Sequence, residues 1–211
     1  FVLIFGRLAQ MPCGELSHGV FYLAALVPWV TFANGLSRSA LSLEANVSLV
    51  EKVYFPRVLI PASLVLSTVP DFLIGWLLLA AFAIAHGHDA VTVWAVMPVF
   101  LCVQLLFCLG LGLFLSALNV QYRDVRHASG FLVQLLFFAT PVIYGLERVP
   151  TEWAAVLLLN PMGAVISGYR AALEGVVPWM MMGQGTLVAF LVFVAGFWFF
   201  RSRERKFADI I

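Results

Sequence analysis

Residues that commonly perform chemistry are sparse in this sequence. The only cluster of histidines, His86-Gly-His88-Asp89, could offer two imidazoles and a carboxylate to a metal ion. Its loose spacing and its position between two long apolar runs favour a polar turn instead. The three cysteines are scattered, and Cys102 and Cys108 share one apolar run, which favours small core residues over a redox pair or a zinc site. We therefore predict no metal site.

Catalytic and nucleotide-binding motifs are also missing from the sequence. It contains no G-x-x-x-x-G-K-[ST] phosphate loop, no G-x-S-x-G nucleophile elbow and no H-E-x-x-H metal helix. One carboxylate, Asp71, lies inside an apolar run, where such groups often relay protons. Pro70 immediately before it favours a structural role, in which Asp71 caps a new helix start. We predict no catalytic residue and no cofactor bound by this chain.

The composition explains why polar groups are so few. Of the 211 residues, 63% are hydrophobic and 11% are charged, and the mean hydropathy is +1.00. A soluble domain of this size has too little interior to bury so much apolar surface. The composition excludes a cytosolic enzyme, a disordered chain and a disulfide-rich secreted module, and the net charge of +1 gives no bulk attraction to nucleic acid. The sequence predicts an all-α integral membrane protein.

Long uncharged runs mark the expected spans, each of which needs about 20 mostly apolar residues. The chain opens in an apolar stretch, residues 1–6, without an initiator Met, so we expect part of a first span to be missing. The prediction is a single transmembrane domain, residues 1–211, with six helices of which the first is truncated. The remaining runs are Leu16–Ser37, Val58–His88 with Asp71 inside it, Ala90–Gln121, Ala128–Leu146 and Gly175–Phe200.

The basic residues decide how the segment between Arg148 and Glu174 runs. If this segment does not span, the 12 Lys and Arg residues divide 9 to 3 between the two sides, and if it spans they divide 6 to 6. Membranes select the uneven division, with the basic side in the cytoplasm. We predict that residues 149–174 form two short helices that enter the outer leaflet and return, broken at Asn160-Pro161. The predicted cytoplasmic residues are Arg38, Lys52, Arg57, Arg123, Arg126, Arg201, Arg203, Arg205 and Lys206, and the outer ones are Arg7, Arg148 and Arg170.

Two further features each leave two roles open. The inner loop from Arg38 to Arg57 has the pattern of a short amphipathic helix that lies on lipid headgroups or docks on a soluble partner. Aromatic residues within the spans either stack on the C–H faces of sugars along a conduit or are packing bulk. The aromatic candidates are Tyr22, Trp29, Phe32, Phe137, Phe138 and Tyr144.

Several segments, taken in order, resemble the ABC-2 type permeases that export bacterial polysaccharides. Each segment is a weak match alone, but the ordered set covers nearly the whole chain and is specific. The matching segments are Leu26–Asn34, Asn46–Arg57 followed by Pro61 and Asp71, Leu115–Asp124, Thr140–Tyr144, Asn160-Pro161-Met162 with Arg170, and Phe207–Ile211.

The resemblance implies the transmembrane subunit of an O-antigen, capsule or teichoic-acid exporter in the inner (plasma) membrane. In that family two permease copies form a channel for a polysaccharide or lipid-linked glycan, and two separate ATP-binding cassette subunits bind ATP and Mg²⁺ below it. Both termini of the full protein would be cytoplasmic. The family's amphipathic helix before the first span is absent from this sequence, which agrees with a truncated start.

The resemblance also implies roles for particular residues. Residues 44–57 look like the cytoplasmic coupling loop that the ATPase receives, and residues 149–174 look like an outer gate hairpin that contains Asn160, Pro161 and Arg170. The six aromatic candidates would line the glycan path. The coupling residues would be Glu44, Asn46, Glu51, Lys52, Phe55, Pro56 and Arg57.

Two alternatives remain on sequence grounds. A membrane-embedded sugar or lipid transferase would need a carboxylate or metal cluster near one membrane face, where the chain offers Glu44, Glu51 and Asp124 far apart in sequence. An ABC-2 exporter of a drug or small lipid would share the architecture. Only the family-like motifs and the aromatic content separate that exporter from a glycan exporter.

Overall fold

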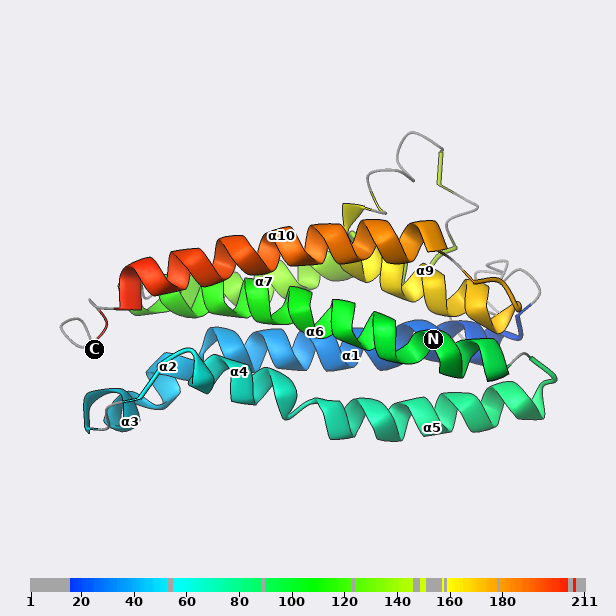
Figure 1. Ribbon diagram of the computed structural model, residues 1–211, viewed down its shortest axis with the longest axis horizontal. Helices are drawn as coiled ribbons and strands as arrows, with labels where there is room; N and C mark the ends of the chain where they lie inside the picture. Colours follow the sequence, from blue (N-terminus) through cyan, green and yellow to red (C-terminus); the bar gives the residue numbers. More distant parts are fainter. Residues whose placement is uncertain are drawn as a thin grey trace.

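The computed structural model describes residues 16–52, 55–88, 90–122, 124–145, 149–150, 157, 159–177, 179–204 and 207. Every regular element in these ranges is a helix (Figure 1), so the all-α prediction is confirmed. The predicted truncated first span falls in residues 1–15, outside the described residues. Four helices of the described chain are long and apolar enough to cross a membrane: His18–Ala40, Leu59–Ala85, Val91–Gln121 and Trp179–Arg203.

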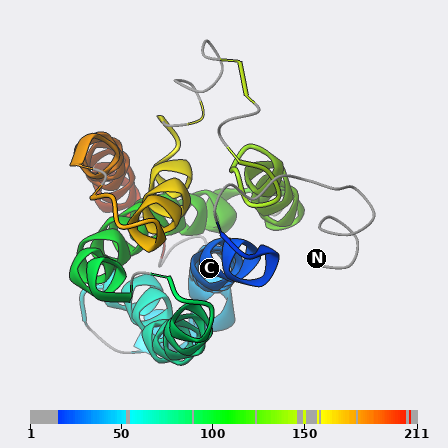
Figure 2. The same ribbon diagram turned by 90° about the vertical axis from the view of Figure 1, so that its right-hand side faces the viewer.

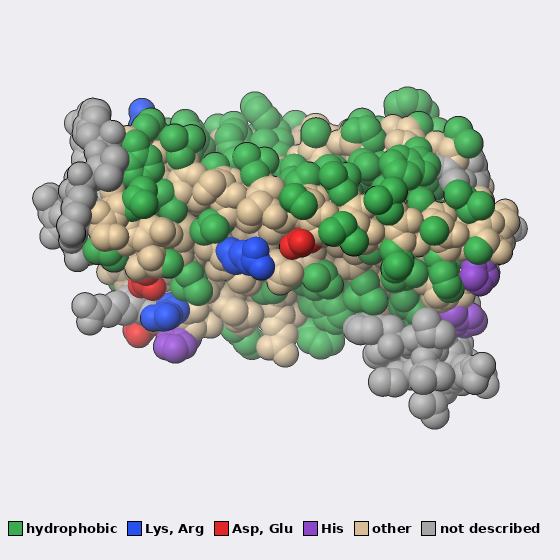
Figure 3. All heavy atoms as spheres, turned by 90° about the horizontal axis from the view of Figure 1, so that it is seen from below, with side chains coloured by type: hydrophobic (Ala, Val, Ile, Leu, Met, Phe, Trp, Pro, Cys, Tyr) green, Lys and Arg blue, Asp and Glu red, His purple; other side chains and the backbone are tan. Residues whose placement is uncertain are grey.

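The helices lie side by side along one long axis (Figures 1 and 2). α6 (Ala90–Gln121) is the central helix and packs against α1 (His18–Ala40), α9 (Pro161–Leu173) and α10 (Trp179–Arg203). α1 also packs against α5 (Val69–Ala85) and, more weakly, against α7 (Val125–Phe138). Seen from below, hydrophobic side chains are spread over this face, with basic and acidic side chains next to each other near its middle (Figure 3).

The apolar run 58–88 divides into α4 (Leu59–Leu66) and α5. Ser67 and Thr68 form the joint, and Thr68 Oγ1 donates a hydrogen bond to Val65 O at 2.7 Å. Asp71 lies in the first turn of α5, where its charge suits the positive end of the helix dipole. The predicted cap is not formed in this described region, since the N-cap residue is Thr68 and no side chain makes the capping bond. Asp71 instead borders a groove of about 250 Å³ between α1 and α5, lined also by Leu26, Val27, Val30, Thr31, Asn34, Thr68 and Gly75.

The run 128–146 forms a shorter helix than predicted. α7 ends at Phe138 because the following Thr140-Pro141 pair disfavours helix before the proline. The chain then turns through residues 139–145. Thr140 Oγ1 donates to Leu136 O at 2.6 Å, and the Tyr144 hydroxyl donates to Phe138 O at 3.1 Å, so side chains satisfy carbonyls that the last turn of α7 leaves free.

The two ends of the bundle differ in charge. α1, α6 and α10 end where α4 and α7 begin, and the short helices α2 (Ser42–Ala45) and α3 (Val47–Lys52) lie at this end too (Figure 1). We call it the basic end. The opposite end carries the turn at Gly87, whose φ is 76°, and the turn after α9 at Gly175, whose φ is 80°. The described basic residues near the basic end are Arg38, Arg57, Arg126, Arg201 and Arg203, and Arg170 lies toward the other end.

Two apolar clusters hold these elements together. The larger one joins α1, α5, α6 and α9, where Tyr169 packs between Trp76 and Phe100 with ring centroids 4.6 and 5.0 Å away. The smaller one, which we call the basic-end cluster, joins α2, α4, α6 and the end of α10. Its buried members are Leu43, Ile60, Leu113, Ala117, Val120, Phe200 and Phe207.

Candidate functional site

The predicted coupling loop, residues 44–57, lies at the basic end as two short helices followed by a turn. Asn46 separates α2 from α3, and its Nδ2 donates to Ser42 O at 2.8 Å. Leu43 is buried beneath α2, whereas Leu49 on α3 is 44% exposed. The loop therefore has one side anchored in the bundle and one apolar side chain free for a partner.

Not all of the predicted coupling residues can be placed. Glu51 and Lys52 belong to α3, but their side chains lie outside the described structure. Phe55 packs against the basic-end cluster, and Pro56 is exposed while its carbonyl accepts the Leu59 N–H at 3.0 Å. The loop thus returns to the bundle at Phe55.

Arg57 is directed inward, toward the end of α10. Its backbone N–H donates to Glu204 Oε1 at 3.2 Å, and its Nη1 donates to the backbone carbonyl of Glu204. The other carboxylate oxygen of Glu204 pairs with Arg201 Nη1 at 2.6 Å. The loop between the first two described spans is therefore bonded directly to the last helix.

A polar recess of about 480 Å³ opens beside α2 at the basic end. Glu44 lines it with Asp124, Arg126 and His127, so two carboxylates and two basic side chains share one hollow. Among the residues that the structure describes, no group of three His, Cys, Asp or Glu side chains is arranged to hold a metal ion. The recess offers charge of both signs to a partner's side chains.

The histidine cluster lies at a turn at the opposite end. His86 Nδ1 lies 2.8 Å from Phe82 O, and His88 Nε2 accepts the Ser17 N–H at 3.4 Å. Asp89 lies outside the described residues. Each described imidazole bonds to backbone, as the interpretation of a polar turn requires.

Three of the six aromatic candidates come together in one stack. Phe137 of α7 contacts Trp29 at a centroid distance of 5.4 Å, and Trp29 contacts Phe32 at 5.6 Å. Phe32 in turn stacks on Phe107 of α6 at 5.3 Å, with the two rings nearly parallel. These rings join α1, α6 and α7 and are packed on one another, so a conduit along them requires the helices to separate.

Of the other three candidates, Phe138 adjoins this stack, since its ring centroid lies 5.6 Å from that of Phe137. Tyr22 is buried on α1, edge-on to Phe21 at 5.3 Å. Phe138 is 63% exposed, and Tyr144 is half-buried in the turn that follows it. The predicted path therefore has a packed part at the stack and an exposed edge at Phe138, and the two are in contact.

The predicted break at Asn160-Pro161 is the start of α9. Asn160 is the N-cap, with its Oδ1 accepting the Met162 N–H at 3.1 Å, and Pro161 occupies the first turn. Asn160 Nδ2 donates to Thr140 Oγ1 at 2.8 Å, which ties this start to the turn after α7. Residues 151–156 of the predicted hairpin lie outside the described residues, so its re-entrant course stays a prediction.

Arg170, near the end of α9, holds the turn after α7. Its guanidinium donates to Pro141 O at 2.7 Å, Val142 O at 2.8 Å and Tyr144 O at 3.1 Å. The carbon at its centre lies 3.5 Å from the centroid of the Phe21 ring on α1. Arg170 is 7% exposed, so several carbonyl dipoles and a ring face replace its water. It locks α9, α1 and the 141–144 turn together.

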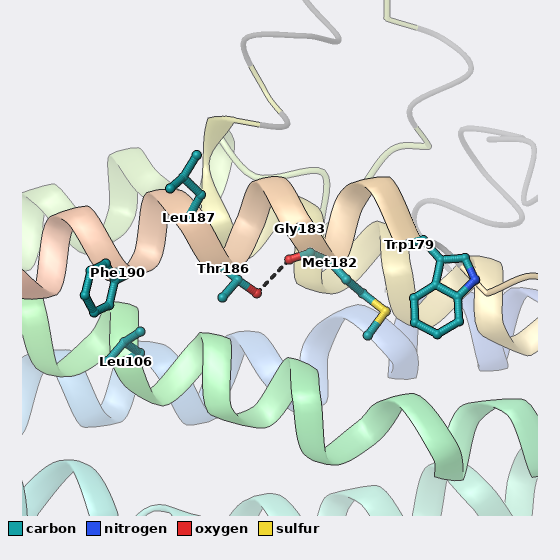
Figure 4. Close-up of a pocket in the computed structure, with 7 residues that line it drawn as sticks. All are labelled: Leu106, Trp179, Met182, Gly183, Thr186, Leu187 and Phe190. Carbon is teal, nitrogen blue, oxygen red and sulfur yellow. Dashed lines mark hydrogen bonds between the residues drawn. The ribbon is translucent and has the colours of Figure 1, made fainter.

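An apolar groove of about 590 Å³ lies between α6 and α10 (Figure 4). Phe190 of α10 lies beside Leu106 of α6 at one end of this groove, and Trp179 lies at its other end. Thr186 Oγ1 donates to Met182 O at 2.7 Å, so its hydroxyl is bonded within the helix. The lining of the groove is therefore predominantly apolar.

The family assignment follows from sequence comparison. A family model described as "ABC-2 type transporter" matches residues 1–173, which include the loop 44–57, the aromatic stack, Asn160 and Arg170. This chain belongs to the ABC-2 type transporter family. It is a multi-pass membrane permease, and its helical bundle agrees with that family's fold.

Curated relatives of this ABC-2 permease carry transport names. The O-antigen export system permease protein RfbA of Myxococcus xanthus is 32% identical and covers 90% of this chain and 75% of that protein. The polysialic acid transport protein KpsM of Escherichia coli is 25% identical and covers 80% of this chain and 66% of that protein. The inner membrane transport permease YadH of Escherichia coli K12 is 26% identical, over 91% of this chain and 78% of that protein.

Sequence reasoning missed three residues of this permease that the structure brings into its site. Phe21 faces Arg170, Phe107 completes the aromatic stack, and Glu204 bonds to Arg57. Glu204 also lies beyond the residues that the family model matches. Its one signal in the sequence is that it is a lone acid within the basic tail 201–206.

Proposed function

We propose that this chain is the transmembrane subunit of an ATP-driven exporter that moves a polysaccharide, free or lipid-linked, across the inner membrane. The observation that carries the proposal is the family match over residues 1–173 together with the O-antigen permease that is 32% identical over 90% of the chain. ATP and Mg²⁺ belong to a separate ATP-binding cassette subunit. Two copies of the permease form the channel, and both termini of the full protein face the cytoplasm.

The loop 44–57 is the surface that this ATPase engages. It lies at the basic end, where the positive-inside rule places the cytoplasm. Leu49 offers an exposed apolar contact, and the recess beside Glu44 accepts charged side chains of the partner. The loop is also firmly attached, since Leu43 is buried and Asn119 Nδ2 donates to Ala40 O at 2.7 Å just before it. A push on this loop therefore moves α1 and α6.

The glycan follows the aromatic residues of α1 and α7. Trp29, Phe32 and Phe137 offer ring faces to sugars once the helices separate, and many weak stacking contacts let a chain bind without being trapped. The exposed edge at Phe138 faces the second copy of the permease. Residues 149–174 act as the gate, held closed by Arg170 and Asn160.

Reconstitution of the full-length permease with its candidate ATPase in lipid nanodiscs tests this proposal. We expect stable co-purification, ATP hydrolysis that depends on the permease, and surface polysaccharide in cells that express both genes. A well-folded permease that binds no ATP-binding cassette subunit would return the question to a membrane-embedded transferase. ATPase binding without any export of glycan would point to another cargo.

A further inference from the structure

The end of α10 is attached to the coupling loop by a compact set of contacts. Glu204 receives two hydrogen bonds from Arg57, one on its carboxylate and one on its backbone carbonyl. The Glu204 side chain is only 16% exposed, and its second carboxylate oxygen pairs with the exposed Arg201. The attachment therefore joins residues 147 positions apart.

The second bond has a clear physical origin. The last carbonyls of an α-helix have no partner within the helix and carry partial negative charge. The guanidinium of Arg57 donates to such a carbonyl just after α10 ends. Arg57 therefore acts as a C-terminal cap that the coupling loop supplies to another helix.

An apolar contact supports the polar one. Phe207 is fully buried and packs edge-on against Phe200 with a centroid distance of 5.3 Å. Both rings belong to the basic-end cluster with Leu43 of α2, and Phe55 of the loop packs against the same cluster. Arg203 Nη1 also donates to Gln121 Oε1 at 3.0 Å, which ties α10 to the end of α6.

α10 in turn reaches the gate helix. A Cβ added at Gly185 of α10 would lie 2.9 Å from the Cβ of Ala164, so the two helices are in close contact there. α9 and α10 are also consecutive in the chain and are separated only by residues 174–178. A displacement of α10 at the basic end therefore acts on α9 without passing through α1.

We propose that Glu204, with Phe207, is a clamp that positions the coupling loop on α10, so that ATP-driven movement of the loop reaches the gate through α10. The inference rests on the proposed function. Glu204 is a positioning residue, since it acts on the ATPase contact through Arg57 and touches neither ATP nor glycan. Arg57 is the loop residue that the clamp holds, since both of its hydrogen bonds to Glu204 lie within the permease.

The test compares variants in the reconstituted complex of permease and ATPase. Glu204→Ala removes the acceptor of the Arg57 N–H, and we expect a roughly tenfold fall in glycan exported per ATP hydrolysed, as loss of a charged hydrogen bond implies. Glu204→Gln keeps an acceptor oxygen and should retain most of the coupling. Arg201→Gln is the matched control, because it removes the ion pair and leaves both Arg57 bonds in place.

A second measurement separates positioning from folding. Spin labels at Leu59→Cys, two residues after the loop and outside the proposed ATPase contact, and at Trp198→Cys, both exposed positions, report the distance between the end of the loop and α10 in a chain whose native cysteines are replaced by Ala. We expect this distance to stay fixed when ATP binds to the wild-type complex and to become broadly distributed in Glu204→Ala. The variant should remain folded and should co-purify with the ATPase as the wild type does.

The outcomes distinguish the two proposals. If the wild-type permease binds no ATPase or exports no glycan, the proposed function fails. If the wild-type complex exports and Glu204→Ala couples as well as Arg201→Gln, with the same label distances, the clamp is wrong and the proposed function stands.

Discussion

The backbone of Gly196 on α10 touches the carbonyl of Gly110 on α6. A Cβ at residue 196 would overlap that oxygen, and a Cβ at residue 110 would lie 2.6 Å from the Cα of Phe193. Such contact lets two helices approach closely enough for extensive van der Waals packing, which is the main source of helix association in a membrane. α10 is otherwise largely exposed, with few buried residues along its length. This crossing therefore fixes α10 on the bundle.

Gly196→Ala should force α6 and α10 apart and destabilise the permease by about 1–3 kcal/mol, the usual cost of overpacking. The measurement is thermal unfolding in nanodiscs. Gly183→Ala is the matched control in the same helix, because nothing lies within 4 Å of its added Cβ. That control should be neutral or stabilising by up to about 1 kcal/mol, since Ala favours a helix more than Gly does. Equal unfolding temperatures for both variants would contradict the role of the crossing.

Arg170→Met should lower stability by at least about 2 kcal/mol, because it leaves the buried carbonyls of residues 141, 142 and 144 without their donor. Arg170→Lys should recover only part of the loss, since an ammonium group cannot reach all of these carbonyls at once. Thermal unfolding measures the loss of stability in both variants. Limited proteolysis tests whether the turn is loosened in Arg170→Lys, and we expect faster cleavage in the 141–150 segment than in wild type.

Asn160→Ala should cost about 1 kcal/mol through loss of the α9 cap. Asn160→Asp keeps the acceptor for the Met162 N–H and loses the donor to Thr140, so its cost should be smaller. Comparing both variants in a Thr140→Val background isolates the bond between the cap and the α7 turn. If Asn160→Asp is as harmful there as in wild type, that bond contributes nothing.

Phe32→Ala should open the aromatic stack, because it removes the ring between Trp29 and Phe107. The expected result is a permease destabilised by about 3–5 kcal/mol, and cells that express it should become sensitive to bulky antibiotics. Phe138→Ala, a truncation of an exposed ring, should leave both properties close to wild type. If Phe138→Ala made cells sensitive to these antibiotics and Phe32→Ala did not, the barrier to their entry through the permease would lie outside the stack.

Arg57→Ala should leave the protein folded and inserted while ATP hydrolysis no longer drives export. The reason is that Arg57 joins the coupling loop to Glu204, and its loss frees the loop without removing a spanning helix. ATPase rates and export are measured together in the reconstituted complex. Normal export by this variant would refute the coupling role.

Much of the fold could be predicted because span length and hydropathy are set by the bilayer. Two joints were also predicted, since Pro70 and Pro161 each lie where a helix starts, whereas the end of α7 before Pro141 was not. The division of Lys and Arg residues along the chain predicted which loops gather at the basic end, because membranes select an uneven distribution of positive charge. Each of these signals is local or additive along the chain.

The partners of the key side chains could not be predicted in this way. Arg170 binds main-chain carbonyls, and every residue, including Pro141, offers the same carbonyl, so no sequence pattern marks these acceptors. Glu204 and Arg57 meet across 147 positions, and the Gly110–Gly196 contact depends on how two helices cross. Aromatic identity likewise did not distinguish the packed ring of Phe32 from the exposed ring of Phe138.

The packed stack of Trp29, Phe32, Phe107 and Phe137 has a bioenergetic consequence. A pore wide enough for a sugar chain would also conduct protons and would discharge the gradient on which the cell depends. Rings in direct contact leave little room between them for a file of water. If the glycan follows this path as proposed, the packed rings keep the resting permease from draining the proton-motive force, even when many copies are present in the membrane.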